Sequence, residues 1–265
     1  MLPRQSKTVR DRNPSRVLCR SFHRPLDAPN RTRSPTGGIG RSIAIAFAEA
    51  GANLVLVSLT QSQLDEAAGA VRDAGGDTIT IATDVTDRAA VSAMADQVKQ
   101  AQGRVDILVN NAGGGIEPKS IADSDPELWI EDVNVNLISA YLVTRAILPL
   151  MKKSGGKIIN TGSGMGHSSG AGSSAYHVGK AGMWMLTRCM ADEVWEDGIT
   201  VNELIPGPVA TDLTAGRMEV GGPPPFSPSE YVKGPDDVVP LAMWLATQPP
   251  HGPTAQSFSL IRRAI

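Results

Sequence analysis

Short apolar runs rich in β-branched residues alternate with longer segments of helical periodicity from about residue 38 to the C-terminus. This alternation is typical of βαβ units, whose helices cover both faces of a parallel sheet. The runs predict strands at residues 53–58, 78–82, 105–110, 157–161, 200–205 and 256–261, and helices at residues 38–50, 61–74, 88–100, 127–151, 174–195 and 235–246. We therefore expect an α/β fold, a single doubly wound domain over residues 36–265.

The length and composition suit one such domain. With 265 residues, 41% of them hydrophobic, the chain can bury one sizeable core. Its two cysteines, Cys19 and Cys189, have neither disulfide-framework nor zinc-site spacing, which fits a reducing compartment. No apolar run approaches the roughly 20 residues that cross a bilayer, and no short apolar segment follows a charged start, so we expect no secretory signal. We expect a cytoplasmic protein without a metal or a membrane partner.

The first 35 residues differ in composition from the rest. They hold nine Lys and Arg residues against two acidic ones, a net charge of +7, which leaves residues 36–265 with a net charge of −9. An acidic body argues against nucleic-acid binding by the domain. With its five prolines, the basic segment is expected to be disordered or atypical, and mitochondrial targeting or nucleic-acid binding are the alternatives.

The segment at residues 214–233 also differs, because it is rich in Gly and Pro. We expect a mobile excursion that covers a substrate beside the rigid sheet.

A glycine-rich run at residues 36–40 opens the first predicted helix. Gly38, Ile39 and Gly40 would let a pyrophosphate approach the backbone at the positive end of the helix dipole. Since short glycine motifs also occur by chance, the alternative is an ordinary helix start. A phosphate loop here would make the domain a Rossmann-type dinucleotide-binding fold.

Two further segments follow predicted strands, at the edge where open α/β sheets bind ligands. Asn111, Ala112 and Gly113 follow one strand, and Asp84 and Val85 follow another. The carboxylate of Asp84 could accept a hydrogen bond from an adenine amino group, or it could cap the helix that follows. Both segments are candidate cofactor contacts.

Tyr176 and Lys180 lie four residues apart in a predicted helix, so their side chains share one face. An ammonium group close to a phenol stabilises the phenolate and lowers the pKa of the tyrosine. Such a group can donate a proton to a carbonyl, or accept one from an alcohol, while hydride moves the other way. The alternative is an ordinary surface pair.

Ser163 and Asn136 are the other polar candidates. Ser163 follows a predicted buried strand, where its hydroxyl could bind a substrate oxygen or stabilise a turn. Asn136 stands among apolar residues of a helix that should pack inward, where it could be functional or a satisfied interior amide.

These residues occur in the order that the classical short-chain dehydrogenase/reductase family shows. The chain resembles that family, and its 3-oxoacyl-acyl-carrier-protein reductase-like members, in Asn110-Asn111-Ala112-Gly113, Asn136, Ser163, Tyr176-His177-Val178-Gly179-Lys180 and Pro206-Gly207. The resemblance covers residues 36–265. It implies an NAD(P)-dependent oxidoreductase that interconverts a small-molecule carbonyl and a secondary alcohol, and that assembles as a homodimer or homotetramer.

The resemblance also implies a role for each matching residue. Tyr176 would be the general acid/base, Lys180 would lower its pKa and bind the nicotinamide ribose, Ser163 would orient the carbonyl, and Asn136 would support a water-linked proton relay. Asn111 and Gly113, with Ala112 between them, would line the adenosine side. After Pro206 and Gly207, Val209 and Thr211 would hold the nicotinamide amide and the phosphates.

Cofactor choice depends on the end of the second predicted strand. No Asp or Glu stands at residues 57–60 to bind a ribose diol, and no arginine stands there for a 2′-phosphate. Because Ser58, Thr60 and Arg41 could receive a phosphate, NADP is favoured slightly over NAD.

The N-terminal part departs from the family pattern. Family members have an apolar strand that leads directly into Thr-Gly-x-x-x-Gly-x-Gly, whereas this chain has Arg33 and Ser34 at the Thr-Gly positions. The first strand, which lies in the middle of such sheets, is therefore expected to be missing or atypical.

Three explanations follow from this departure. Residues 16–22 could replace the strand through a long connection, the fold could be compromised, or an altered segment could precede an otherwise ordinary enzyme, which we favour. The damaged loop also motivates an alternative function, an impaired or non-catalytic nucleotide-binding protein.

Overall fold

The computed structural model describes residues 15–20, 38–116, 118–214, 217–224 and 229–262. Within these ranges, seven strands form one parallel sheet in the order β3-β2-β1-β4-β5-β6-β7. They are β1 (Arg16–Arg20), β2 (Asn53–Ser58), β3 (Thr78–Ala82), β4 (Ile107–Asn110), β5 (Gly156–Thr161), β6 (Ile199–Ile205) and β7 (Ser257–Ser259). The strand order reverses between β1 and β4, the position where doubly wound sheets bind ligands.

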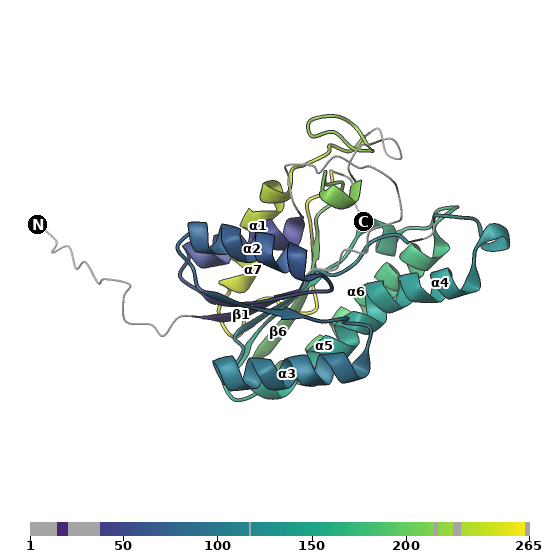
Figure 1. Ribbon diagram of the computed structural model, residues 1–265. Coiled ribbons are helices and arrows are strands. Elements are labelled where there is room, and N and C mark those ends of the chain that lie inside the picture. The colour runs from purple at the N-terminus through teal and green to yellow at the C-terminus, as the bar shows by residue number, and fades with distance from the viewer. Residues whose placement is uncertain (1–14, 21–37, 117, 215–216, 225–228, 263–265) are drawn as a thin grey trace, which may run out of the picture.

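Helices cover both faces of this sheet (Figure 1). On one face lie α1 (Ile39–Glu49), α2 (Gln61–Asp73) and α7 (Val239–Ala246), and on the other α3 (Arg88–Gln102), α4 (Pro126–Val133), α5 (Ser139–Met151) and α6 (Ser174–Val194). One apolar cluster fills each space, with Ile43 and Leu54 under the first group and Leu108 and Ile147 under the second. The predicted doubly wound fold is confirmed.

The middle of the sheet holds β1, which corrects the expectation that the first strand is missing. Leu18 lies opposite Val55 of β2 and Leu108 of β4, and its side chain is fully buried. Residues 16–20 thus replace the expected strand, as one of the three explanations proposed, and the sheet includes residues before position 36. The strand is atypical because arginines stand at both of its ends and only its three middle residues are apolar.

The rest of the N-terminal segment, at 1–14 and 21–37, lies outside the described residues. So do Thr36 and Gly37 of the expected phosphate loop, whereas Gly38 is the N-cap of α1.

The predicted helix at residues 127–151 is one helical stretch with a change of hydrogen bonding inside it. A five-residue π-helix, η3 (Asn134–Ile138), joins α4 to α5. By length and composition alone, Pro126–Met151 is long and apolar enough to cross a membrane. The sequence analysis had expected no run of that kind. In the fold, α4 contacts α6 and α5 contacts α3.

Buried amides connect the central strands to the helices that cover them. Asn110 Nδ2 on β4 donates to Asn160 Oδ1 on β5 (2.8 Å) and to Thr144 Oγ1 on α5 (3.0 Å). Asn160 Nδ2 donates in turn to Thr187 Oγ1 on α6 (2.9 Å). Because both amides are completely buried, their hydrogen bonds fix the carboxyl ends of β4 and β5 relative to α5 and α6.

Replacing Leu18 by alanine tests the central position of β1. Because the side chain is fully buried, its truncation is expected to lower the free energy of unfolding by about 2–5 kcal/mol. Urea unfolding followed by circular dichroism measures the change. The control is Val220→Ala, at an exposed side chain, with an expected change below about 0.5 kcal/mol. Equal midpoints for Leu18→Ala and the unaltered protein would mean that another segment supplies the central strand.

Candidate active site

Tyr176 and Lys180 lie on one face of the first turns of α6, as their spacing predicted. Lys180 Nζ is 5.7 Å from the centroid of the Tyr176 ring. Lys180 is buried, and its ammonium donates to the Thr161 carbonyl at the end of β5 (2.9 Å). The cation is therefore held between α6 and the carboxyl end of a central strand.

Ser163 faces Tyr176 from the turn that follows β5. Ser163 Oγ accepts a hydrogen bond from Met165 N (3.2 Å), and the Ser163 hydroxyl is close enough to the phenol to influence the pKa of Tyr176. Burial raises the pKa of Tyr176, the Ser163 hydroxyl lowers it, and the charge of Asp132 raises it again. The net shift of the Tyr176 pKa is upward, opposite to the direction expected from Lys180, because burial of the phenol dominates.

Asn136 lies in the π-helix η3 and is completely buried. Its Nδ2 donates to the Gly114 carbonyl (2.8 Å), and its Oδ1 accepts a hydrogen bond from Gly114 N (3.1 Å). Both ends of the amide thus bind the segment that follows β4. The interior amide is therefore satisfied, as one of the two sequence alternatives expected.

Gly113 is the point where two of these side chains meet. A Cβ atom at this position would lie 2.7 Å from Asn136 Oδ1 and 2.9 Å from Lys180 Nζ. Both distances are too short for contact with a carbon atom. The two polar groups therefore occupy the space in which any residue other than glycine would place its Cβ atom.

Asp132 is a site residue that the sequence analysis missed. The residue is 1% exposed, and its carboxylate accepts hydrogen bonds from Asn136 Nδ2 (2.6 Å) and from Ile116 N (2.9 Å). It therefore orients the Asn136 amide and places negative charge near Tyr176. The available signal was an acidic residue four positions before a candidate amide in an apolar helix.

A cavity lies beside the carboxyl ends of β1 and β2 and the first turns of α1 and α2. Its lining residues are Cys19, Gly38, Gly40, Arg41, Ala44, Leu56, Val57, Ser58, Gln63, Leu64, Glu66, Ala67 and Asp212. Gly38 is the N-cap of α1, and no side chain caps that end in the described part of the chain. The first N–H groups of α1 are therefore suited to bind an anion.

Three residues were expected to receive a phosphate, and two of them line this cavity. Arg41 and Ser58 do, whereas Thr60 is the N-cap of α2 and is absent from the lining. Gln63 and Glu66 of α2 also line the cavity and were not predicted from the sequence. Gln63 contacts a predicted residue, because Ser58 Oγ donates a hydrogen bond to Gln63 Oε1 (2.8 Å).

Asp84 forms a turn rather than the helix cap that one alternative gave it. It accepts hydrogen bonds from the N–H (2.9 Å) and hydroxyl (2.6 Å) groups of Thr86, and the α3 N-cap is Asp87, which accepts from Ala90 N. Val85 packs in the core, so a ligand could contact only its backbone.

Ala112 and Asn111 lie just beyond β4. The Ala112 side chain belongs to the core, and Asn111 Oδ1 accepts a hydrogen bond from Thr161 Oγ1 (3.2 Å). Asn111 thus connects the segment after β4 to the end of β5.

The segment after β6 holds the remaining predicted contacts. Pro206 ends the strand, and Gly207 has a φ of 71°, a backbone conformation that favours glycine. Val209 pairs with Lys233, and Thr211 N donates to Thr214 Oγ1 (2.8 Å).

The expected excursion at 214–233 is described in part. Gly221 N donates to the Val232 carbonyl (3.0 Å), and Val232 N donates to the Gly222 carbonyl (2.9 Å). Residues 215–216 and 225–228 lie outside the described residues.

Comparisons with known proteins agree with this architecture. The family model described as short chain dehydrogenase matches residues 35–220. The uncharacterized oxidoreductase YxbG of Bacillus subtilis is 36% identical over 196 residues, which are 72% of this chain and 72% of that protein. The 3-oxoacyl-acyl-carrier-protein reductase FabG of Haemophilus influenzae is 35% identical over 180 residues, 68% of this chain and 73% of that protein. A short-chain dehydrogenase/reductase of Burkholderia xenovorans superposes with a TM-score of 0.80 at 28% identity, covering 93% of this chain and 94% of that one.

Gly113→Ala tests the convergence of Asn136 and Lys180. The added methyl group would displace one or both polar groups, so we expect the affinity for a nicotinamide dinucleotide to fall by about tenfold or more. Fluorescence titration measures that affinity. The matched control is Gly115→Ala, because a Cβ atom there meets no atom within 4 Å and should leave the affinity unchanged. Equal affinities for the two variants would contradict the convergence.

Proposed function

The chain belongs to the short-chain dehydrogenase/reductase family and is an oxidoreductase, and from this we propose that it interconverts a carbonyl and a secondary alcohol with Tyr176 as general acid/base. One observation carries the proposal: the Tyr176 ring lies 5.7 Å from Lys180 Nζ, and the Ser163 hydroxyl is close enough to the phenol to lower the pKa of Tyr176. A proton donor, a carbonyl-orienting hydroxyl and a cation thus meet beyond the carboxyl end of β5.

The residues of this site fit a nicotinamide dinucleotide. The uncapped start of α1 at Gly38 suits its phosphates, and the buried ammonium of Lys180 would bind the ribose of its nicotinamide half. Val209 and Thr211, after β6, would hold that same half. When bound, the cofactor would supply a hydride to the carbonyl carbon, or take one from the alcohol carbon.

The side chains of this protein would position the substrate oxygen and transfer the proton to or from it. The Ser163 hydroxyl would donate a hydrogen bond to the substrate oxygen and hold it beside the phenol. In reduction, Tyr176 gives its proton to that oxygen, and in oxidation the phenolate takes the proton back. Because burial raises the pKa of Tyr176, the phenol stays protonated near neutral pH, which suits the reducing direction. Lys180 would stabilise the phenolate that forms.

Asn136 and Asp132 would act by holding this arrangement in place. The amide of Asn136 binds the segment after β4, and the Asp132 carboxylate fixes the direction in which the amide points. Such preorganised polar groups do not have to reorient when charge develops on the substrate.

Tyr176→Phe removes the proton donor and keeps the ring. We expect turnover of a panel of carbonyl compounds, followed by the absorbance of the reduced cofactor, to fall by about 10²- to 10⁴-fold. Cofactor affinity should be unchanged. The matched control is Tyr141→Phe, at an exposed tyrosine on α5. Cofactor binding without turnover in the unaltered protein would instead favour an impaired nucleotide-binding protein.

Within this proposal, NADP is the preferred cofactor. Arg41 lines the cavity with Ser58 and Gln63, two neutral side chains, at the end of β2. A cation and hydroxyl or amide groups suit a 2′-phosphate. Glu66, further along α2, lines the same cavity and would oppose a phosphate.

Arg41→Ala and Glu66→Gln should therefore change NADPH affinity in opposite directions. Loss of the Arg41 charge is expected to raise the NADPH dissociation constant about tenfold and leave that of NADH within about twofold. Glu66→Gln should lower the NADPH dissociation constant, because it removes a negative charge from the cavity. Isothermal titration with both cofactors measures these values, and a tighter NADH complex in the unaltered protein would overturn the preference.

A further inference from the structure

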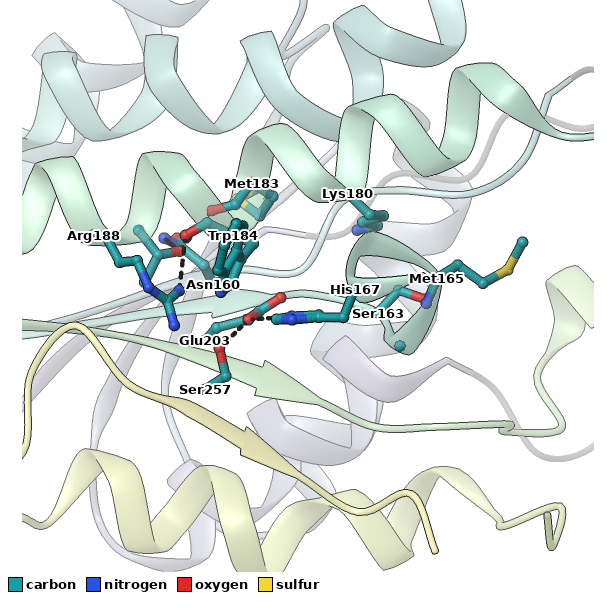
Figure 2. A network of polar contacts seen from close by, with 12 residues as sticks. Asn160, Ser163, Met165, His167, Lys180, Met183, Trp184, Arg188, Glu203 and Ser257 are labelled. Carbon is teal, nitrogen blue, oxygen red and sulfur yellow. Dashed lines mark hydrogen bonds and ion pairs between the residues drawn. The ribbon is translucent and has the colours of Figure 1, made fainter. Parts of the chain in front are cut away.

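A carboxylate is completely buried in β6, a strand whose residues are all buried. Glu203 has no exposed surface, and such a group is costly to bury unless polar partners compensate. Its Oε2 lies 3.0 Å from His167 Nε2 and accepts a hydrogen bond from Ser257 Oγ on β7 (Figure 2). The other oxygen, Oε1, has no hydrogen-bond partner among the described residues.

Glu203 also determines which residue can precede Ser163. A Cβ atom at Gly162 would overlap the Glu203 carboxylate, so any other residue there would displace the carboxylate. Gly162 therefore lets the strand β6 bring a charged group directly beneath the turn that carries Ser163.

That turn is attached to β6 at both of its ends. Gly162 N donates to the Leu204 carbonyl (2.8 Å), and the His167 side chain contacts the neighbouring residue, Glu203. Between these two attachments lies η4 (Gly164–His167), whose first turn is closed by the bond from Gly166 N to the Ser163 carbonyl (2.9 Å). Ser163 thus belongs to a short segment whose two ends are fixed to consecutive residues of one strand.

The other side of the segment packs against α6. A Cβ atom at Gly166 would lie 2.7 Å from the carbonyl group of Lys180, so the two backbones are in close contact. The His167 ring meets the Trp184 ring edge-on, with centroids 5.3 Å apart, and Arg188 lies over Trp184, 4.4 Å from its centroid. Figure 2 shows this stack beside Glu203. The His167 ring therefore has packing partners as well as a polar one.

We infer that His167 and Glu203 are positioning residues, which fix the segment 162–167 on β6 and thereby hold the Ser163 hydroxyl at the phenol of Tyr176. The inference rests on the proposed role of Ser163. The contact with Glu203 limits movement of the segment away from the sheet, and the contact with Lys180 limits movement toward the helix. Loss of the His167 contact would free one end of the segment and leave the Gly162 end attached.

His167→Leu is the first test, with His167→Gln as the conservative variant that can still donate to Glu203. We expect kcat for carbonyl reduction to fall about 10- to 100-fold in His167→Leu, with cofactor affinity within about twofold. His167→Gln should recover kcat to within about threefold of the unaltered protein. The matched control is His251→Leu, at an exposed histidine near Trp195, which should change neither value.

The same substitution in a Ser163→Ala background separates positioning from a general structural effect. If His167 acts through Ser163, then His167→Leu adds less than about twofold to the loss already caused by Ser163→Ala. Equal fold-losses in both backgrounds would overturn the inference. His167→Leu removes one of the two hydrogen-bond partners described for the buried Glu203 carboxylate. The double variant His167→Leu with Glu203→Gln has no carboxylate there, and it should show the same loss of kcat.

Hydrogen exchange gives a readout that does not need turnover. Amides of residues 163–168 should exchange faster in His167→Leu than in the unaltered protein, and the rate should recover in His167→Gln. Unchanged exchange would overturn the inference even in an active enzyme. Faster exchange in a protein without turnover would support the inference about the segment and count against the proposed function alone.

Discussion

The pairing of β1 with β2 and β4 is the interaction on which the rest of the sheet depends. Without it, facing rows of N–H and C=O groups on two central strands would be buried without partners, at a cost of roughly 1–3 kcal/mol each. The same five residues also carry Cys19, which lines the cavity beside α1. Burial raises the pKa of the Cys19 thiol to about 12, so the thiol stays protonated and behaves as an apolar wall.

The site is assembled from polar groups that each have a partner on another element. Lys180 of α6 donates to the end of β5, and Asn136 of the π-helix binds the segment after β4. The segment that carries Ser163 is likewise connected to another element, because His167 of that segment contacts Glu203 on β6. Buried hydrogen bonds of this kind fix side-chain directions because an unpaired group in the interior would be costly. The geometry of the site is therefore determined jointly by contacts with the carboxyl ends of β4, β5 and β6.

Much of the fold could be predicted from the sequence, because the helices and strands after residue 38 have strong and regular apolar patterns. β1 was only one of three alternatives, since three apolar residues between two arginines give a weak strand signal. Its position depends on tertiary pairing, which overrides local pattern.

The candidate site was predictable to a similar degree. Tyr176, Ser163 and Asn136 stand in recognisable motifs, but Asp132 and Gln63 acquire their roles only when separate elements meet. The direction of the Tyr176 pKa shift also depends on burial, which spacing alone does not reveal. The oligomeric state, the cellular compartment and the role of the basic N-terminal segment stay predictions.

The π-helix at Asn134–Ile138 changes the rotational phase of the helix that contains it. Successive residues of an α-helix are turned by about 100°, so one widened turn rotates every later side chain by about that angle relative to an uninterrupted helix. Here the half before the shift contacts α6, and the half after it contacts α3. The two halves of one helical stretch therefore face different surroundings: α4 directs Asp132 toward Asn136 at the candidate site, and α5 directs Val143 and Ile147 into the core.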